Sequence, residues 1–433
     1  MGTVEFVFGY YLWKLRGGEM KKTISVAALG LVLAAGSAYG SGYRVPEQSV
    51  NSTARAGGYV ASTPSADAAF FNPANMSWLE NRIYFEAAAT YIGLASITYE
   101  DNRTSAFNGE TDSESFLVPT FFLVSPDFNG LRAGLSLDAP AGLSKKWSQR
   151  YPKTFAQEFS MTVLEANPSV SYRVNDMISF AVGIRGLYAD ATVKSSGMIS
   201  AEYGGVTASR DMDGDTWEWG YNLAATLRPV ENMNLAVTYR SNVDLELEGD
   251  ASLSTSASFA GPATYNGDGK VEIPVPAVLA IAGSYTFFDQ LTVELEYDRT
   301  YWSEYETLDF IYPTSLANPF LNGAFDAPKA KNWEDTDAWR ISVSYTMDAF
   351  TFMAGFAIDE NPVPDSTLSF DLPDSDAKLY SVGFRYQVND DLELGMAYLY
   401  DDKESRTVVN EHVNGTFDDA AAHLVTFGLS YKM

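Results

Sequence analysis

Short segments of alternating polarity recur along most of this 433-residue chain. In the last of them, residues 423–433, Val425 and Phe427 fall on one face, whereas Thr426 and Gly428 fall on the other. Such alternation is typical of a β-strand, in which successive side chains point to opposite faces. After residue 40, no stretch approaches the roughly 18 uninterrupted apolar residues that a membrane-spanning helix requires. The pattern therefore favours an all-β fold.

Fourteen segments of this kind can be counted. They span residues 82–98, 116–125, 131–140, 161–174, 178–195, 215–229, 233–248, 270–287, 291–302, 337–347, 350–359, 377–388, 392–401 and 423–433. An even number of strands is typical of a single-chain bacterial transmembrane barrel, with a lipid-facing exterior and a polar interior. A soluble β-sandwich alternates in the same way. The export signal and the many aromatic strand ends favour a transmembrane antiparallel β-barrel of about fourteen strands over residues 82–433.

An export signal precedes the barrel segments. Lys21 and Lys22 form a basic start, residues 24–35 form a short apolar run, and Ala38 and Gly40 are small residues at a spacing suited to signal peptidase. Residues 20–40 are therefore predicted to be a signal peptide, with cleavage after Gly40 or, alternatively, after Ala38. The predicted location is the outer membrane of a Gram-negative bacterium.

Residues 1–19 do not belong to the signal-peptide pattern. Residues 16–19, Arg-Gly-Gly-Glu, are what a purine-rich ribosome-binding site would encode if it were translated. We therefore interpret residues 1–19 as a misassigned extension, with a genuine extension as the alternative. Within the barrel, short turns at 174–176 and 388–391 are predicted to be periplasmic. Longer polar stretches are predicted to be extracellular, at residues 141–160, 196–214, 249–269, 303–336 and 402–422.

Composition excludes several classes of function. The formal net charge of −27 argues against a nucleic-acid partner, because phosphate binding needs clustered Lys and Arg. The absence of cysteine excludes disulfides, zinc–thiolate sites and thiol catalysis. Of the two histidines, His423 alternates away from Ser430, and no Gly-x-Ser-x-Gly elbow, phosphate loop or metal-ligand spacing is present. We therefore predict no catalytic residue, cofactor or metal.

Residues 41–81 lack alternation and are rich in Gly, Ala, Ser and Asn. Two features favour a plug inside the barrel over a disordered periplasmic tail. The apolar residues around Asn-Pro-Ala, which include Met76 and Trp78, favour burial. The pair Gly57-Gly58 permits a tight bend.

The plug segment and several later blocks resemble the FadL-type family of outer-membrane transporters of long-chain fatty acids and other hydrophobic compounds. The blocks are SGYRVPEQSVNSTARAGGYVASTPSADAAFFNPANM, WEWGYNLAATLRP, LAVTYRSNVDLELEGD, IPVPAVLAIAGSYTFFDQLTVELEYDRTYWS, NWEDTDAWRISVSY and FMAGFAIDENPVPDSTLSFDLPDSD. Their order and spacing cover the chain from residue 41 to the end. The last strand also resembles the signal that the outer-membrane assembly machinery reads, although Met433 replaces the usual terminal aromatic residue.

The resemblance implies a fourteen-stranded barrel whose lumen is plugged by an N-terminal hatch. It implies passive uptake of a fatty acid, hydrocarbon or aromatic compound, with sideways exit into the membrane at a kink in the third strand. The expected partners are therefore the substrate, outer-membrane lipid, lipopolysaccharide and the assembly machinery. Two alternatives remain: a general diffusion porin and, less favoured, an outer-membrane lipolytic enzyme.

Candidate site residues also follow from the resemblance. Asn72, Pro73 and Ala74 match a hatch motif that faces the lateral opening, although an ordinary Asn-Pro turn is the alternative. Pro140 and Gly142 match the kink, and both residue types weaken a strand ladder.

Two lysines are candidates for the substrate carboxylate. Lys331 aligns with a family lysine that meets this group, and Lys329 is near enough in the sequence to replace it. A solvated loop lysine is the alternative. The family's second cationic position falls on Ser195, and the adjacent Lys194 is expected on the opposite face.

Overall fold

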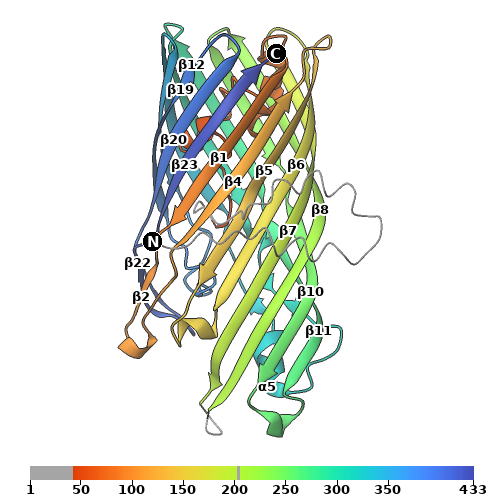
Figure 1. Ribbon diagram of the computed structural model, residues 1–433, viewed down its shortest axis with the longest axis vertical. Helices are drawn as coiled ribbons and strands as arrows, with labels where there is room; N and C mark the ends of the chain where they lie inside the picture. Colours follow the sequence, from red (N-terminus) through yellow and green to blue (C-terminus); the bar gives the residue numbers. More distant parts are fainter. Residues whose placement is uncertain (1–41, 202–204) are drawn as a thin grey trace. The chain divides into compact units, whose positions relative to one another are not determined.

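A computed structural model describes residues 42–201 and 205–433, which form a closed antiparallel β-barrel (Figure 1). The predicted extension and signal peptide, residues 1–19 and 20–40, lie outside the described residues. The first barrel strand, β1 (Tyr84–Leu94), pairs with the last, β23 (Ala421–Lys432), and with β4 (Glu114–Val124), so the wall has no free edge. The prediction of an all-β barrel is confirmed.

The described wall contains fourteen strand positions, two of which are interrupted. One interrupted position consists of β9 (Met233–Arg240) and β10 (Val243–Thr255), and the other of β11 (Thr264–Val275) and β12 (Ala277–Phe287). Pro276 separates the second pair, as expected for a residue without a backbone donor. The remaining wall strands are β5 (Leu131–Lys146), β6 (Glu158–Arg173), β7 (Ile178–Ser200), β8 (Val206–Val230), β13 (Leu291–Tyr301), β17 (Thr336–Met347), β18 (Phe350–Asp359), β19 (Ala377–Gln387) and β20 (Leu392–Lys403).

Several strands are longer than the sequence pattern predicts. β5 continues beyond Pro140, and β7, β8, β10 and β11 extend into stretches that were predicted to be extracellular loops. These extensions lie beyond the lipid-facing part of the wall. There the outer face carries Asp211, Asp213 and Asp215 instead of apolar side chains, so the apolar–polar alternation fades.

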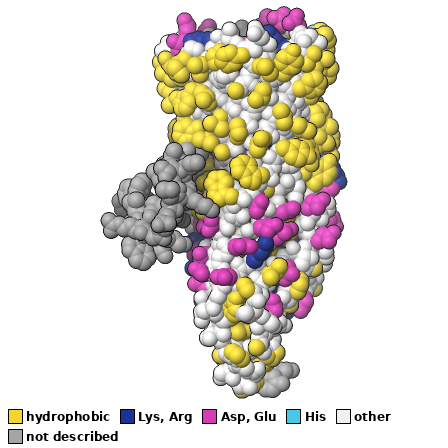
Figure 2. All heavy atoms as spheres, turned by 90° about the vertical axis from the view of Figure 1, so that its right-hand side faces the viewer, with side chains coloured by type: hydrophobic (Ala, Val, Ile, Leu, Met, Phe, Trp, Pro, Cys, Tyr) yellow, Lys and Arg dark blue, Asp and Glu magenta, His cyan; other side chains and the backbone are white. Residues whose placement is uncertain are grey.

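Figure 2 shows apolar side chains covering one part of the barrel wall and acidic side chains gathered next to them. We call the first region the apolar belt. On β7 it includes Phe180, Val182 and Ile184, each of which is more than half exposed. Exposed apolar rows of this kind suit contact with lipid. None of the helices in the described residues is long and apolar enough to cross a membrane.

Long connections gather at one end of the barrel, which we call the loop end. It carries β2 (Thr98–Asp101), β3 (Gly109–Glu110), β21 (Arg406–Val409) and β22 (Asn414–Asp418) in a small sheet, the pair β14 (Thr307–Leu308) and β16 (Lys329–Ala330), and β15 (Phe310–Ile311) beside β11. Its helical turns are η3 (Ser105–Phe107), η4 (Pro152–Thr154), η6 (Ser258–Ala260), η7 (Trp302–Glu304), α5 (Pro319–Leu321) and η8 (Asn322–Asp326).

The described residues before β1 fold inside the barrel as the predicted hatch. They form three short helices, α3 (Val50–Ala54), α4 (Ala68–Phe71) and η2 (Pro73–Trp78). Ser49 caps α3 through a capping box with Ser52, and Met76 in η2 is fully buried. The apolar residues of this segment therefore form a buried plug and not a periplasmic tail.

Candidate functional site

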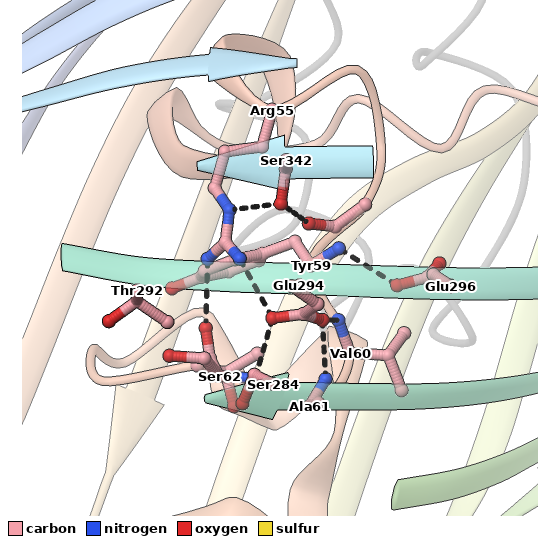
Figure 3. Close-up of polar contacts among 12 residues, drawn as sticks. Arg55, Tyr59, Val60, Ala61, Ser62, Ser284, Thr292, Glu294, Glu296 and Ser342 are labelled. Atoms are coloured by element: carbon pink, nitrogen blue, oxygen red, sulfur yellow. Dashed lines mark hydrogen bonds and ion pairs between the residues drawn. The ribbon is translucent and has the colours of Figure 1, made fainter. Parts of the chain in front are cut away.

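A buried carboxylate fastens the hatch to the wall (Figure 3). Glu294 on β13 accepts hydrogen bonds from the backbone N–H groups of Val60 at 2.7 Å, Ala61 at 2.6 Å and Ser62 at 3.0 Å. It also pairs with Arg55 at 2.7 Å, and both side chains are at most 2% exposed. Because the charge is fully paired and hydrogen-bonded, its burial is tolerated.

A second set of polar contacts joins the hatch to β1 and to the C-terminal strands β19 and β23. Arg385 on β19 donates to Asn51 Oδ1 at 2.6 Å and pairs with Glu86 on β1. On β23, the hydroxyl of Ser430 lies 3.0 Å from that of Ser65 in the hatch. The main body of the hatch is therefore held on several sides of the lumen.

The Asn-Pro-Ala motif is part of this fastening. The side chain of Asn72 caps η2 by accepting from Ala74 N–H at 3.1 Å, and it donates to Thr226 on β8 at 3.0 Å. Pro73 occupies the first helical position, where a missing N–H costs nothing. Ser179 on β7 donates to Ala74 O at 2.9 Å. In the part of the chain that the structure describes, no hydrogen bond joins residues 72–74 to residues 139–142.

The wall between β4 and β5 is interrupted. Their pairing runs from Val124 opposite Gly134 to Phe121 opposite Leu137 and then stops. On its other side, β5 shifts register against β6 between Asp138 and Ala141. Near the loop end, the chain just before β4 meets β5 again, where Asp112 N–H donates to Lys146 O at 3.0 Å.

The predicted kink residues lie at this interruption, although the strand continues through them. Pro140 falls within the register shift, and Gly142 follows it. The groups that reach them come from the start of the hatch. Val45 N–H donates to Pro140 O at 2.9 Å, and Gly142 N–H donates to Tyr43 O at 2.9 Å. Sequence analysis did not single out residues 43–48, because no polarity pattern or motif marks them.

A cavity of about 70 Å³ adjoins the interruption inside the barrel. Pro140 lines it together with Phe70 and Phe71 of the hatch. Arg240, also in the lining, lies over the ring of Phe70 with 4.4 Å between the guanidinium carbon and the ring centroid. Glu165 pairs with Arg240 and, at 2.9 Å, with Arg185. Aromatic rings and paired charged groups therefore lie together beside the interruption between β4 and β5.

The two candidate lysines differ in their surroundings. Lys331 is 6% exposed and forms an ion pair with Asp371, so it already has an anionic partner. Lys329 keeps contact with solvent at the loop end. Partial loss of hydration and the positive charge of nearby Arg210 lower the pKa of Lys329 to about 8, while Asp371 opposes this shift.

Arg210 is a buried cation that the sequence analysis did not identify. It lies on the loop-end part of β8, opposite Ser195 on β7, and is 5% exposed. Its guanidinium carbon lies 4.5 Å from the ring centroid of Phe310 and 5.5 Å from that of Phe325. Its Nε and Nη1 atoms have no hydrogen-bond partner, and burial lowers its pKa to about 10.

Arg210 could have been identified as an inward-facing residue if strand β8 had been predicted to begin before it. Residues 196–214 were predicted to be a loop, so no face was assigned to Arg210. With alternation continued through β8, Arg210 falls on the inner face, opposite the exposed Asp211 and Asp213.

The described residues contain no group of three or more Asp, Glu or His side chains that could hold a metal ion. Of the histidines, His423 contacts the hydroxyl of Tyr398 at 2.8 Å, and His412 packs on the ring of Phe155. Neither contact provides a nucleophile of the kind that lipolytic enzymes use.

The chain is similar over most of its length to several bacterial proteins. It is 24% identical to the long-chain fatty acid transport protein of Escherichia coli K12, over 87% of this chain and 92% of that protein. It is also 24% identical to outer membrane protein P1 of Haemophilus influenzae Rd, over 94% of this chain and 98% of that protein.

Solved structures share the fold. A FadL homologue of Pseudomonas aeruginosa superposes with a TM-score of 0.79 and 19% identity, over 90% of this chain and 99% of the other. The toluene transporter TodX of Pseudomonas putida superposes with a TM-score of 0.68 and 17% identity, over 89% of this chain and 97% of the other.

A family model described as outer membrane protein transport protein (OMPP1/FadL/TodX) matches residues 31–432. The match spans the described hatch and the whole barrel, including the closing strand β23. Proteins of this family are transport proteins of the outer membrane rather than enzymes. The plugged, interrupted barrel described above therefore belongs to the OMPP1/FadL/TodX family of outer-membrane transport proteins.

Proposed function

We propose that this protein takes up long-chain fatty acids, or closely similar amphiphilic carboxylates, by passive diffusion across the outer membrane. The observation that carries the proposal is Arg210, a buried guanidinium with two unpartnered nitrogens between the rings of Phe310 and Phe325. An uncompensated buried cation is costly. A carboxylate satisfies it, and the rings accommodate the start of the acyl chain.

A neutral hydrocarbon is the second candidate substrate. The solved toluene transporters support it as structural relatives, but they share only the fold with this chain. Toluene offers no hydrogen-bond acceptor to the free Nε and Nη1 atoms of Arg210. The relation to proteins named long-chain fatty acid transport proteins supports the carboxylate instead.

The hatch argues against a general diffusion porin. Its fastening through Glu294 and Arg385 fills the lumen with buried, hydrogen-bonded structure. A hydrophobic molecule therefore needs another way out. Release into the periplasm would expose the acyl chain to water at about 0.8 kcal/mol per CH₂. We propose that it leaves sideways, between β4 and β5, where Leu117 at the edge of the interruption belongs to the apolar belt.

Binding to the purified protein tests the substrate class. We expect palmitate to bind about tenfold or more tightly than methyl palmitate, because a hydrogen bond to a charged group contributes about 1.5–3 kcal/mol. Arg210→Met should remove most of the difference. The matched control is Lys194→Met, since Lys194 already contacts Glu158 and Asp211. Equal affinity for the acid and the ester in the wild type would overturn the carboxylate proposal.

A further inference from the structure

The site around Arg210 at the loop end holds more positive than negative charge. Arg210, Lys329 and Lys331 are cations, and Asp371 is the anion that interacts with each of them. Three positive charges against one negative charge leave these four groups with a net charge of +2 when Lys329 is protonated. The single charge of a carboxylate would neutralise only half of this excess.

Two of the three cations lack an anionic partner. Lys331 is paired with Asp371, whereas the Nε and Nη1 atoms of Arg210 have no hydrogen-bond partner. Among residues 42–201 and 205–433, no ion pair or hydrogen bond involves the ammonium of Lys329. Like charges without counter-charges raise the free energy of the empty site. A ligand that brings two negative charges therefore matches the site better than a ligand that brings one.

The two unpaired cations lie at different depths. Lys329 on β16 pairs with Leu308 on β14, and two residues beyond Leu308 the ring of Phe310 lies 4.5 Å from the guanidinium carbon of Arg210. Arg210 is 5% exposed, whereas Lys329 is in contact with solvent. The two charges repel each other across this short distance. A head group held by Arg210 therefore has the ammonium of Lys329 on its solvent side.

The number of oxygens in the head group matters as well as its charge. A carboxylate has two oxygens, and a bidentate contact with a guanidinium uses both of them. A phosphate monoester has three terminal oxygens and a charge of about −1.5 to −2 at pH 7. When Arg210 binds two of these oxygens, the third is free to meet Lys329. A phosphate head therefore satisfies both unpaired cations at once.

We propose that the site prefers amphiphiles whose head group is a phosphate monoester, and that Lys329 selects this head over a carboxylate by pairing with its third oxygen. The rings of Phe310 and Phe325 accommodate the start of the apolar chain for either head group. This inference rests on the proposed function, because both head groups bind the same guanidinium.

Two ligands with the same alkyl chain test the charge of the head group. Hexadecyl phosphate and hexadecyl sulfate both have three terminal oxygens, but the sulfate carries only one negative charge. We expect the purified protein at pH 7 to bind the phosphate about threefold to fivefold more tightly, as an additional partly exposed ion pair provides. The measurement is isothermal titration calorimetry in a neutral detergent. Equal affinity for the two ligands would overturn the inference.

Lys329→Met tests which residue makes the distinction. We expect the variant to lose affinity for hexadecyl phosphate more than for hexadecyl sulfate, so that the ratio between the two falls. Lys378→Met is the matched control, because Lys378 lies on the outer face of β19 and pairs with Glu404 at 2.9 Å. Its ratio should equal that of the wild type. An unchanged ratio in Lys329→Met would remove Lys329 from the selection of the head group.

A change of pH gives a second readout without a mutation. Lys329 has a pKa of about 8 and loses its charge between pH 7 and pH 9, whereas Arg210, with a pKa of about 10, stays charged. Burial lowers the pKa of His412, which interacts with Lys329, so His412 is neutral throughout this range. Although burial opposes it, the charge of Lys331 holds the pKa of Asp371 below its usual value, so Asp371 stays ionised. At pH 9 the wild-type ratio should therefore fall to that of Lys329→Met, and a constant ratio would contradict the role of Lys329.

Two further ligands separate this inference from simpler outcomes. Inorganic phosphate should not displace hexadecyl phosphate at equal concentration, because it has no chain for the rings of Phe310 and Phe325. Equal competition would overturn the preference for an amphiphile and leave a site for free anions. Palmitate is the reference. If palmitate bound no better than its methyl ester, the proposed function would fail, whereas normal palmitate binding with equal phosphate and sulfate affinities would contradict only the inference.

Discussion

Ser195 on β7 lies directly opposite Arg210 on β8. The position that the family resemblance assigns to a cation is therefore neutral, but the neighbouring strand brings a guanidinium to the same level of the barrel. Arg210 and Lys331 give the loop-end interior a positive region, with the solvent-exposed Lys329 near both and Asp371 as the partner of Lys331. The charge of this site therefore depends on residues of both β7 and β8, and not only on the position of Ser195.

Binding of palmitate should depend on pH through Lys329. Its pKa is about 8, so the ammonium is charged below that pH and loses its charge as pH rises through it. Arg210, with a pKa of about 10, stays charged between pH 7 and pH 9. We expect the affinity for palmitate to fall between these two pH values. Lys329→Met should bind more weakly at pH 7 and show a smaller change with pH, and an unchanged pH dependence in this variant would assign the titration to another group.

Glu294→Gln should loosen the hatch. The amide keeps one acceptor but leaves Arg55 without its ion-pair partner, and breaking a buried pair costs about 3–5 kcal/mol. We expect steady ion current in planar bilayers and earlier unfolding on heating. Glu246→Gln is the control, because Glu246 forms an exposed pair with Lys270 on the outer face. If the two variants were equally closed to ions, Glu294 would not be essential to the plug.

Deletion of residues 42–79 should turn the barrel into a pore. Without the hatch, the carboxylates of Glu86, Glu294 and Glu296 would face an open lumen. We expect a large conductance that favours cations, measured as a reversal potential across a salt gradient. A closed or anion-selective barrel would contradict this arrangement of inner charges.

Processing of the chain remains a prediction from the sequence. Mature protein from outer membranes should begin at Ser41, or at Tyr39 if cleavage follows Ala38. Intact-mass measurement checks this expectation. Recovery of protein that still begins at Met1 would contradict both the signal peptide and the misassigned extension.

The barrel could be predicted because lipid contact imposes alternation on every wall strand. The fourteen predicted segments correspond to the fourteen wall positions, including β23 at residues 421–432. Prediction failed where the lipid constraint ends. β5 continues beyond Pro140, and β8 begins at Val206 within a predicted loop.

The candidate site was less accessible from the sequence. Burial of Asn72 and its neighbours followed from their apolar context, but their contacts with β7 and β8 did not. The contact of Gln48 Nε2 with Ala139 O has no local signal at all, since the two residues lie 91 positions apart. Arg210 could be placed inside the barrel only by assigning the correct face to a strand whose outer side is acidic instead of apolar.

The fastening of the hatch also constrains the order of assembly. Its helices α3 and α4 contain five and four residues, far below the roughly 12–15 at which an isolated helix becomes marginally stable. Arg55 meets a partner 239 positions later, and Asn51 meets one 334 positions later. The segment that is synthesised early therefore has no stable structure of its own until β13 and β19 have been placed. It must remain extended and free of aggregation during the crossing of the periplasm, and it acquires its shape only as the barrel closes around it.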